Sequence, residues 1–81
     1  MSETPHRADT TLDVTGLACP VPITELQDFV QDLEPGTVVE VLADDGGIQW
    51  DLPAWCISHG HTLLDLQEEG RLWKGYVRLE G

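Results

Sequence analysis

The sequence predicts an α+β fold: a two-layer α/β sandwich in the order β-α-β-α-β-β, with a four-stranded mixed sheet and two helices on one face. Apolar residues alternate or cluster in four short segments typical of strands, and they recur at helical spacing in two longer segments. Right-handed crossovers between the strands would place both helices on the same face. The 81 residues have room for one small domain with one core.

The polar N-terminal segment differs from the rest of the chain. Residues 1–9 lack a core-forming pattern and are predicted to be a flexible tail, so the domain is expected to span residues 10–81. Residues 10–16 alternate between apolar and polar side chains, which predicts the first strand. Gly16 is expected to end it.

The first helix and the second strand follow. Helical periodicity covers residues 20–34, with Pro20 suited to the first turn and Pro35-Gly36 as a stop signal. Residues 37–43 are short and rich in β-branched side chains, which predicts a largely buried strand.

The second half of the chain holds the remaining three elements. Residues 48–59 repeat at helical spacing, and Gly60 suits the position just after a helix. Residues 61–66 and 72–79 read as two further strands, separated by a segment that contains a turn-forming glycine.

The charge of the chain restricts its partners. Fifteen acidic residues against four basic ones give a formal net charge of -11, which opposes direct contact with nucleic acid or an anionic membrane surface. No apolar run approaches the roughly 20 residues of a membrane span, and two cysteines do not suggest a disulfide framework. We expect a cytoplasmic monomer that forms transient complexes. The acidity is explained most simply by a solvated surface suited to a saline or alkaline habitat, with partner choice as the alternative.

Cys19 is the candidate catalytic residue. It begins the tetrapeptide Cys19-Pro20-Val21-Pro22 where the first helix is expected to start, and the prolines stiffen that approach. A thiol attacks as its thiolate, and the free N–H groups of a helix start favour an anionic sulfur. We therefore expect a modestly lowered pKa for Cys19, with the acids of the first helix too distant to oppose it. The alternative is a small buried side chain that only fills space.

Other polar and aromatic residues have plainer interpretations. Cys56 shares a helical face with apolar residues, which favours a buried core thiol over a second redox cysteine. Cys56, His59 and His61 could contribute metal ligands, but no fourth ligand lies nearby, so no metal site is expected. The aromatic residues are expected to pack in the core or at its edge, with a partner surface as the alternative: Trp50, Trp55, Trp73 and Tyr76.

The sequence resembles the TusA-like (SirA-like) sulfur-carrier family over nearly all of residues 10–80. The resemblance rests on an ordered set of segments: Leu12-Asp13, Gly16-Leu17-Ala18-Cys19-Pro20-Val21-Pro22, Pro35-Gly36, Ala43-Asp44-Asp45, Asp51-Leu52-Pro53, Cys56 and Gly60-His61. It implies a sulfurtransferase that holds a sulfane sulfur as a persulfide on Cys19, with Gly16, Pro20 and Pro22 supporting the motif. It implies neither a metal nor an organic cofactor.

The resemblance also implies two protein partners. The donor would be a cysteine desulfurase or a rhodanese, and the acceptor would belong to tRNA thiolation, molybdenum-cofactor biosynthesis or sulfur oxidation. Relatives in tRNA thiolation generally carry basic residues on the first helix, where this chain has Glu25 and Asp28. The alternatives are a non-catalytic regulatory or interaction module of the same fold and a two-cysteine redox protein.

Overall fold

In the computed structural model, residues 8–80 are described, and they form one sheet covered by two helices. Residues 1–7 of the predicted tail lie outside the described residues. The elements in chain order are β1 (Thr10–Asp13), α1 (Val21–Val30), β2 (Val38–Ala43), α2 (Ile48–His59), β3 (Thr62–Glu69) and β4 (Leu72–Arg78). The order β-α-β-α-β-β predicted from the sequence is confirmed.

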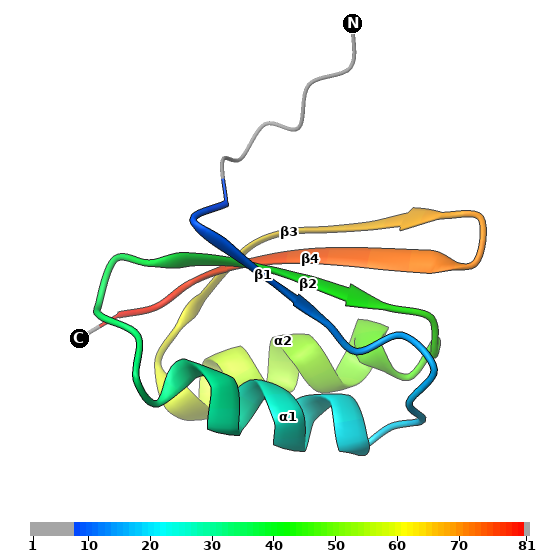
Figure 1. Ribbon diagram of the computed structural model, residues 1–81, viewed down its shortest axis with the longest axis horizontal. Coiled ribbons are helices and arrows are strands. Elements are labelled where there is room, and N and C mark those ends of the chain that lie inside the picture. The colour runs from blue at the N-terminus through cyan, green and yellow to red at the C-terminus, as the bar shows by residue number, and fades with distance from the viewer. Residues whose placement is uncertain (1–7, 81) are drawn as a thin grey trace, which may run out of the picture.

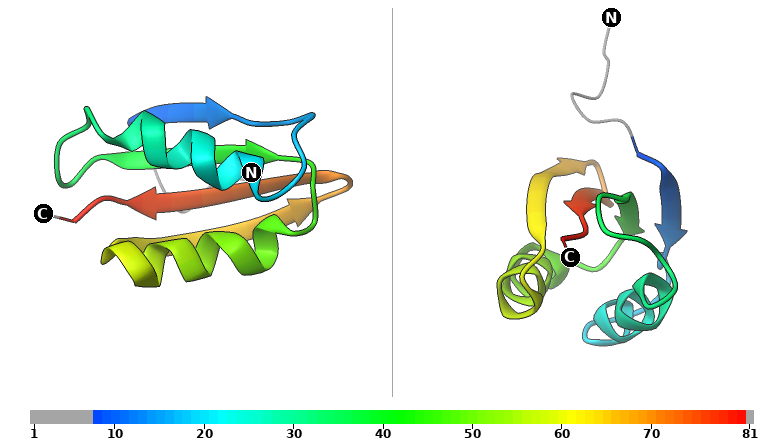
Figure 2. Two further views of the ribbon diagram at one scale, coloured as in Figure 1. Left: turned by 90° about the horizontal axis from the view of Figure 1, so that it is seen from below. Right: turned by 90° about the vertical axis from the view of Figure 1, so that its left-hand side faces the viewer.

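The sheet is mixed and has the strand order β1-β2-β4-β3. β1 pairs with β2 in parallel, whereas β4 pairs antiparallel with both β2 and β3. Figure 2 shows both helices on the same face of the sheet, as predicted. Figure 1 shows that both helices begin at the end of the sheet where β1 and β2 finish. The C-terminal ends of β1 and β2 and the N-terminal ends of α1 and α2 therefore lie at the same end of the sheet.

The core lies between the sheet and the helices. Its members are apolar and at most 9% exposed: Val14, Leu26, Val30, Val39, Val41, Ala43, Ile48, Leu52, Trp55, Cys56, Val77 and Leu79. Alternate residues of β2 face this layer, which is the period-2 pattern of a strand with one buried face. Gly75 of β4 allows α2 to approach closely, because a Cβ there would overlap the Leu52 side chain.

Three element ends differ from the sequence prediction by three or four residues, and the other bounds agree to within one residue. α1 ends at Val30, because the next residues make hydrogen bonds to the residue three positions earlier and not four, and because Pro35 disfavours helical backbone at the residue that precedes it. β1 ends at Asp13, whose carboxylate accepts the N–H of Thr15 at 3.0 Å and turns the chain. β3 continues to Glu69, because Glu69 still pairs with Leu72 of β4 and only two residues, Gly70 and Arg71, form the hairpin loop.

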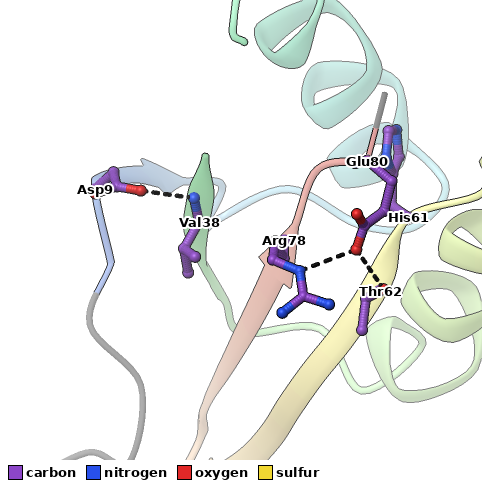
Figure 3. A network of polar contacts seen from close by, with 6 residues as sticks. All are labelled: Asp9, Val38, His61, Thr62, Arg78 and Glu80. Atoms are coloured by element: carbon purple, nitrogen blue, oxygen red, sulfur yellow. Dashed lines mark hydrogen bonds and ion pairs between the residues drawn. The ribbon is translucent and has the colours of Figure 1, made fainter. Parts of the chain in front are cut away.

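Polar contacts fasten both ends of the described chain to the sheet (Figure 3). The Asp9 carboxylate accepts the N–H of Val38 at 2.9 Å, although Asp9 belongs to the predicted tail. Glu80 accepts bonds from Thr62 Oγ1 at 2.7 Å and from Arg78 Nε at 2.9 Å. These contacts lower the pKa of Glu80. They tie the segment after β4 to the start of β3.

Candidate functional site

Cys19 lies in the connection between β1 and α1. Figure 1 shows this connection at the end of the sheet where both helices begin. Pro20 is the N-cap of α1, and Pro22 occupies its first turn and is buried. The peptide bond between Cys19 and Pro20 is cis. Gly16 has a φ of +86°, in the left-handed region that favours glycine, so the turn into this connection depends on it. The predicted motif residues are therefore brought together around a partly exposed thiol.

Two consecutive aspartates at the end of β2 hold this connection in place. The Gly16 N–H donates to Asp44 Oδ1 at 2.9 Å. Asp45 accepts two backbone bonds, from Gly47 N–H at 2.8 Å and a longer one from Cys19 N–H at 3.4 Å. The loop that carries the thiol is thus attached to the loop that begins α2.

The side chain of Cys19 packs against the start of α2. A Cβ placed on Gly47 would lie 3.2 Å from both Cβ and Sγ of Cys19, and 3.2 Å from Asp45 Oδ1. These contacts are tighter than most real Cβ contacts, so a larger residue at position 47 would require Cys19 or Asp45 to shift by a few tenths of an ångström. Asp51, in the first turn of α2, donates its N–H to the Gly47 carbonyl at 3.0 Å, lines a hollow together with Pro20, and its carboxylate acts on the Cys19 thiol electrostatically.

The prediction of a lowered pKa for Cys19 is wrong. Burial, the neighbouring Asp51 carboxylate and the negative charge of Asp45 together raise the pKa of Cys19 to about 11. A helix start favours an anion by only about 0.3–1 kcal/mol at an exposed position, and here two carboxylates and partial burial oppose it. The unloaded cysteine is therefore a neutral thiol at physiological pH.

Asp45, Gly47 and Asp51 are the site residues whose contact with Cys19 sequence reasoning missed. They lie 26, 28 and 32 positions further along the chain, and the sequence showed Asp45 and Asp51 only as matching positions of a family. The order of strands and helices could have predicted these contacts. The ends of two parallel strands and the starts of the helices that follow them meet at one edge of a sheet, so residues 44–51 had to lie beside the Cys19 loop.

Two hollows flank the Cys19 loop. One, of about 350 Å³, runs between α1 and α2 and is lined by Pro20, Ile23, Asp51, Ala54, Trp55, Ser58 and His59. The other, of about 330 Å³, is lined by Gly16, Leu17, Ala18, Asp44 and Asp45. The chain neighbours of Cys19 line these hollows, Pro20 the first and Ala18 the second, so the loop that carries the thiol lies between them.

Three exposed apolar side chains belong to the segments around Cys19 and the start of α2. Leu17 and Val21, on either side of Cys19, are 37% and 43% exposed, and Trp50 in the first turn of α2 is 69% exposed. For Trp50 the alternative of a partner surface fits better than core packing, whereas Trp55 and Tyr76 are buried as expected.

Cys56 and the two nearby histidines do not form a site with Cys19. Cys56 is 2% exposed on the buried face of α2, and burial raises its pKa to about 11. The His59 and His61 rings contact Trp55, at centroid distances of 5.2 and 5.1 Å. Within residues 8–80, no group of three or more His, Cys, Asp or Glu residues is arranged to hold a metal ion. Both cysteines are free, so no Cys19–Cys56 disulfide is present.

Fold and site together define a small two-layer α+β domain with a partly exposed thiol between two helix starts. Over residues 10–79 the chain matches the family model described as Sulfurtransferase TusA. It is 40% identical over 73 residues to the sulfur carrier protein TusA of Pseudomonas aeruginosa, which covers 90% of this chain and 92% of the relative. It is 42% identical over 72 residues to the putative sulfur carrier protein YrkI of Bacillus subtilis, covering 89% and 96%.

The chain belongs to the TusA sulfurtransferase family, which confirms the resemblance noted from the sequence. A crystal structure of a SirA-like protein from Desulfitobacterium hafniense has the same fold, with a TM-score of 0.76 and 22% identity. That match covers 89% of this chain and 99% of the other. None of the described helices is both long and apolar enough to cross a membrane.

Proposed function

We propose that the protein is a sulfur carrier that holds a sulfane sulfur as a persulfide on Cys19 and passes it to another protein. The observation that carries this proposal is the partly exposed thiol of Cys19, on a loop flanked by two hollows, in a chain of the TusA family. Gly16, Pro20 and Pro22 shape the loop that presents the thiol.

The transfer needs two thiol–persulfide exchanges and no bound cofactor. In the first, Cys19 loses its proton and Sγ attacks the outer sulfur of a donor persulfide. The donor's sulfur–sulfur bond breaks, and its inner sulfur leaves with the electron pair as a thiolate. In the second, an acceptor thiolate attacks the outer sulfur on Cys19, and Cys19 leaves as a thiolate that takes up a proton. No net oxidation occurs in either step.

The partners would be a persulfide-forming donor, such as a cysteine desulfurase or a rhodanese, and an acceptor protein with its own reactive cysteine. Exposed acids on α1, Glu25 and Asp28, favour partners with basic residues around that cysteine. The same negative surface opposes nucleic acid and anionic membranes as direct partners, and it opposes self-association of the monomer. The proposed location is the reducing cytoplasm, where both thiols stay free.

Intact mass measurement after incubation with a cysteine desulfurase and cysteine tests the function. We expect one added sulfur atom in the wild type and in Cys56→Ala, and none in Cys19→Ala. A loss of two hydrogens without added sulfur would instead indicate a redox protein, and no mass change with any donor would favour an interaction module. The burial of Cys56 argues against the redox alternative.

The partner surface is tested by reversing charge on α1. Transfer from the wild type to an acceptor with a basic active-site surface should be faster than from a Glu25→Lys, Asp28→Lys double variant, and the difference should shrink as salt increases. Equal rates across the salt series would refute this choice of partner.

A further inference from the structure

The thiol of Cys19 lies in a cradle formed by Asp45, Gly47 and Asp51. The Cys19 N–H points to Asp45 Oδ2 at 3.4 Å, and the Gly47 backbone packs against Cβ and Sγ of Cys19. Asp51 donates its N–H to the Gly47 carbonyl at 3.0 Å and lines, with Pro20, the hollow between α1 and α2. The charged side chains that act on the thiol come from the β2–α2 connection and from α2, and both are acids.

This arrangement has a consequence for which sulfur donor can react. A thiolate on Cys19 would face two carboxylates at once, so the reactive form is disfavoured as long as both charges are uncompensated. A cation placed against Asp51 would compensate one charge and favour the thiolate. An anion in the same place would do the opposite.

We propose that Asp51 makes Cys19 selective for sulfur donors that carry a positive charge beside the sulfur they transfer. The inference rests on the sulfur-carrier function proposed above and adds a rule for its reactants. Asp51 is a positioning residue, since it acts through the Cys19 thiol and not on the transferred sulfur. In a protein donor, the cation would be a Lys or Arg side chain next to the persulfide.

Symmetrical disulfides that differ in charge are suitable probes, because they react with Cys19 without a partner protein. Cys19 gives up its proton to solvent, Sγ forms a bond with one sulfur of the probe, and the probe's own sulfur–sulfur bond breaks. The second half leaves as a thiolate and is then protonated. The probes are cystamine, which is cationic, 2-hydroxyethyl disulfide, which is neutral, and 3,3′-dithiodipropionate, which is anionic.

The experiment measures the rate of adduct formation at Cys19 by mass spectrometry with peptide mapping. Each rate is divided by the rate of the same probe with N-acetylcysteine amide, which corrects for the intrinsic reactivity of the probe. One charge pair about 4 Å apart in water changes a rate about fivefold, so we expect the normalised ratio of cystamine to dithiodipropionate to be about 25. The neutral probe should lie between them.

Replacement of the carboxylate should remove this preference. In Asp51→Asn, we expect the ratio to fall at least about fivefold, while the neutral probe reacts faster at neutral pH because the thiol ionises more readily. The matched control is Glu34→Gln, which removes one exposed carboxylate from the far end of α1 and should keep the wild-type ratio. Asp51→Ser is the second variant if Asp51→Asn does not fold, as judged by circular dichroism.

Two results would overturn the proposal. One is a normalised ratio below about two in the wild type, which needs no variant. The other is an equal fall in Asp51→Asn and Glu34→Gln, which would assign the preference to net charge. Neither result bears on whether Cys19 takes up sulfur, because persulfide loading is measured separately by intact mass.

Discussion

The pH dependence of Cys19 alkylation follows directly from the contacts of its thiol. With a pKa of about 11, the ionised fraction of Cys19 is about 0.03% at pH 7.5, whereas a free cysteine with a pKa near 8.5 is about 9% ionised. The more basic thiolate is intrinsically about tenfold more nucleophilic, which offsets part of this 300-fold deficit. Cys19 should therefore react with iodoacetamide about 20- to 30-fold more slowly than free cysteine at pH 7.5.

The sign of the shift also fixes the shape of the profile. A raised pKa keeps the thiol protonated to higher pH, so the logarithm of the Cys19 rate should rise by about one unit per pH unit from pH 7 to 10. Free cysteine should level off above about pH 9. The assay is a stopped-time alkylation series with peptide mass spectrometry, in which the buried Cys56 is scored separately. A plateau for Cys19 below pH 9, or a rate at pH 7.5 equal to that of free cysteine, would refute the reasoning.

Three further predictions concern stability and are measured by urea unfolding. Gly75→Ala should lower the free energy of unfolding by about 1–3 kcal/mol because the new Cβ overlaps Leu52, whereas Gly46→Ala meets only an ordinary contact and should be nearly neutral. Equal effects would contradict the packing described. Gly16→Ala should lower the free energy of unfolding by about 1–2 kcal/mol because Gly16 has a φ of +86°, although the new Cβ meets no other atom. Gly16→Asn should lower it less, and the reverse order of the two variants would exclude backbone strain as the cause. The free energy of unfolding should fall as pH rises from about 9 to 11, because the thiols ionise in the unfolded chain before they ionise in the folded protein. Buried Cys56 contributes up to about 2.7 kcal/mol of this loss. An unchanged dependence of the free energy of unfolding on pH in Cys56→Ala would contradict this prediction.

The fold was predictable because its signals are local. Period-2 and period-3.6 patterns located every element, and α2 has the predicted bounds, with Gly60 in the left-handed conformation after it. The end of α1 was misplaced because Leu33 continues the helical spacing of apolar residues, although the backbone has already left the α-helix at Val30. Apolar spacing reports which residues face the core, not which backbone bonds they make.

The position of Cys19 was predictable, but its electrostatic environment was not. The motif placed the thiol at a strand-to-helix junction, which is where the structure has it. Its ionisation depends on Asp45 and Asp51, which are distant in sequence and reach the thiol only through the parallel arrangement of β1 and β2. Near Cys19 in sequence lie only the start of α1 and the acids of α1 itself, and these groups alone predict the wrong sign for the pKa shift.

The central claim is that Cys19 carries sulfur as a persulfide. Incubation with a cysteine desulfurase and cysteine, followed by intact mass measurement and peptide mapping, tests it most directly. We predict one added sulfur atom on the peptide that contains Cys19, retained in Cys56→Ala, absent in Cys19→Ala and removed by a reducing thiol. Sulfur added to Cys56 in place of Cys19, or no added sulfur on a folded wild-type protein, would contradict it.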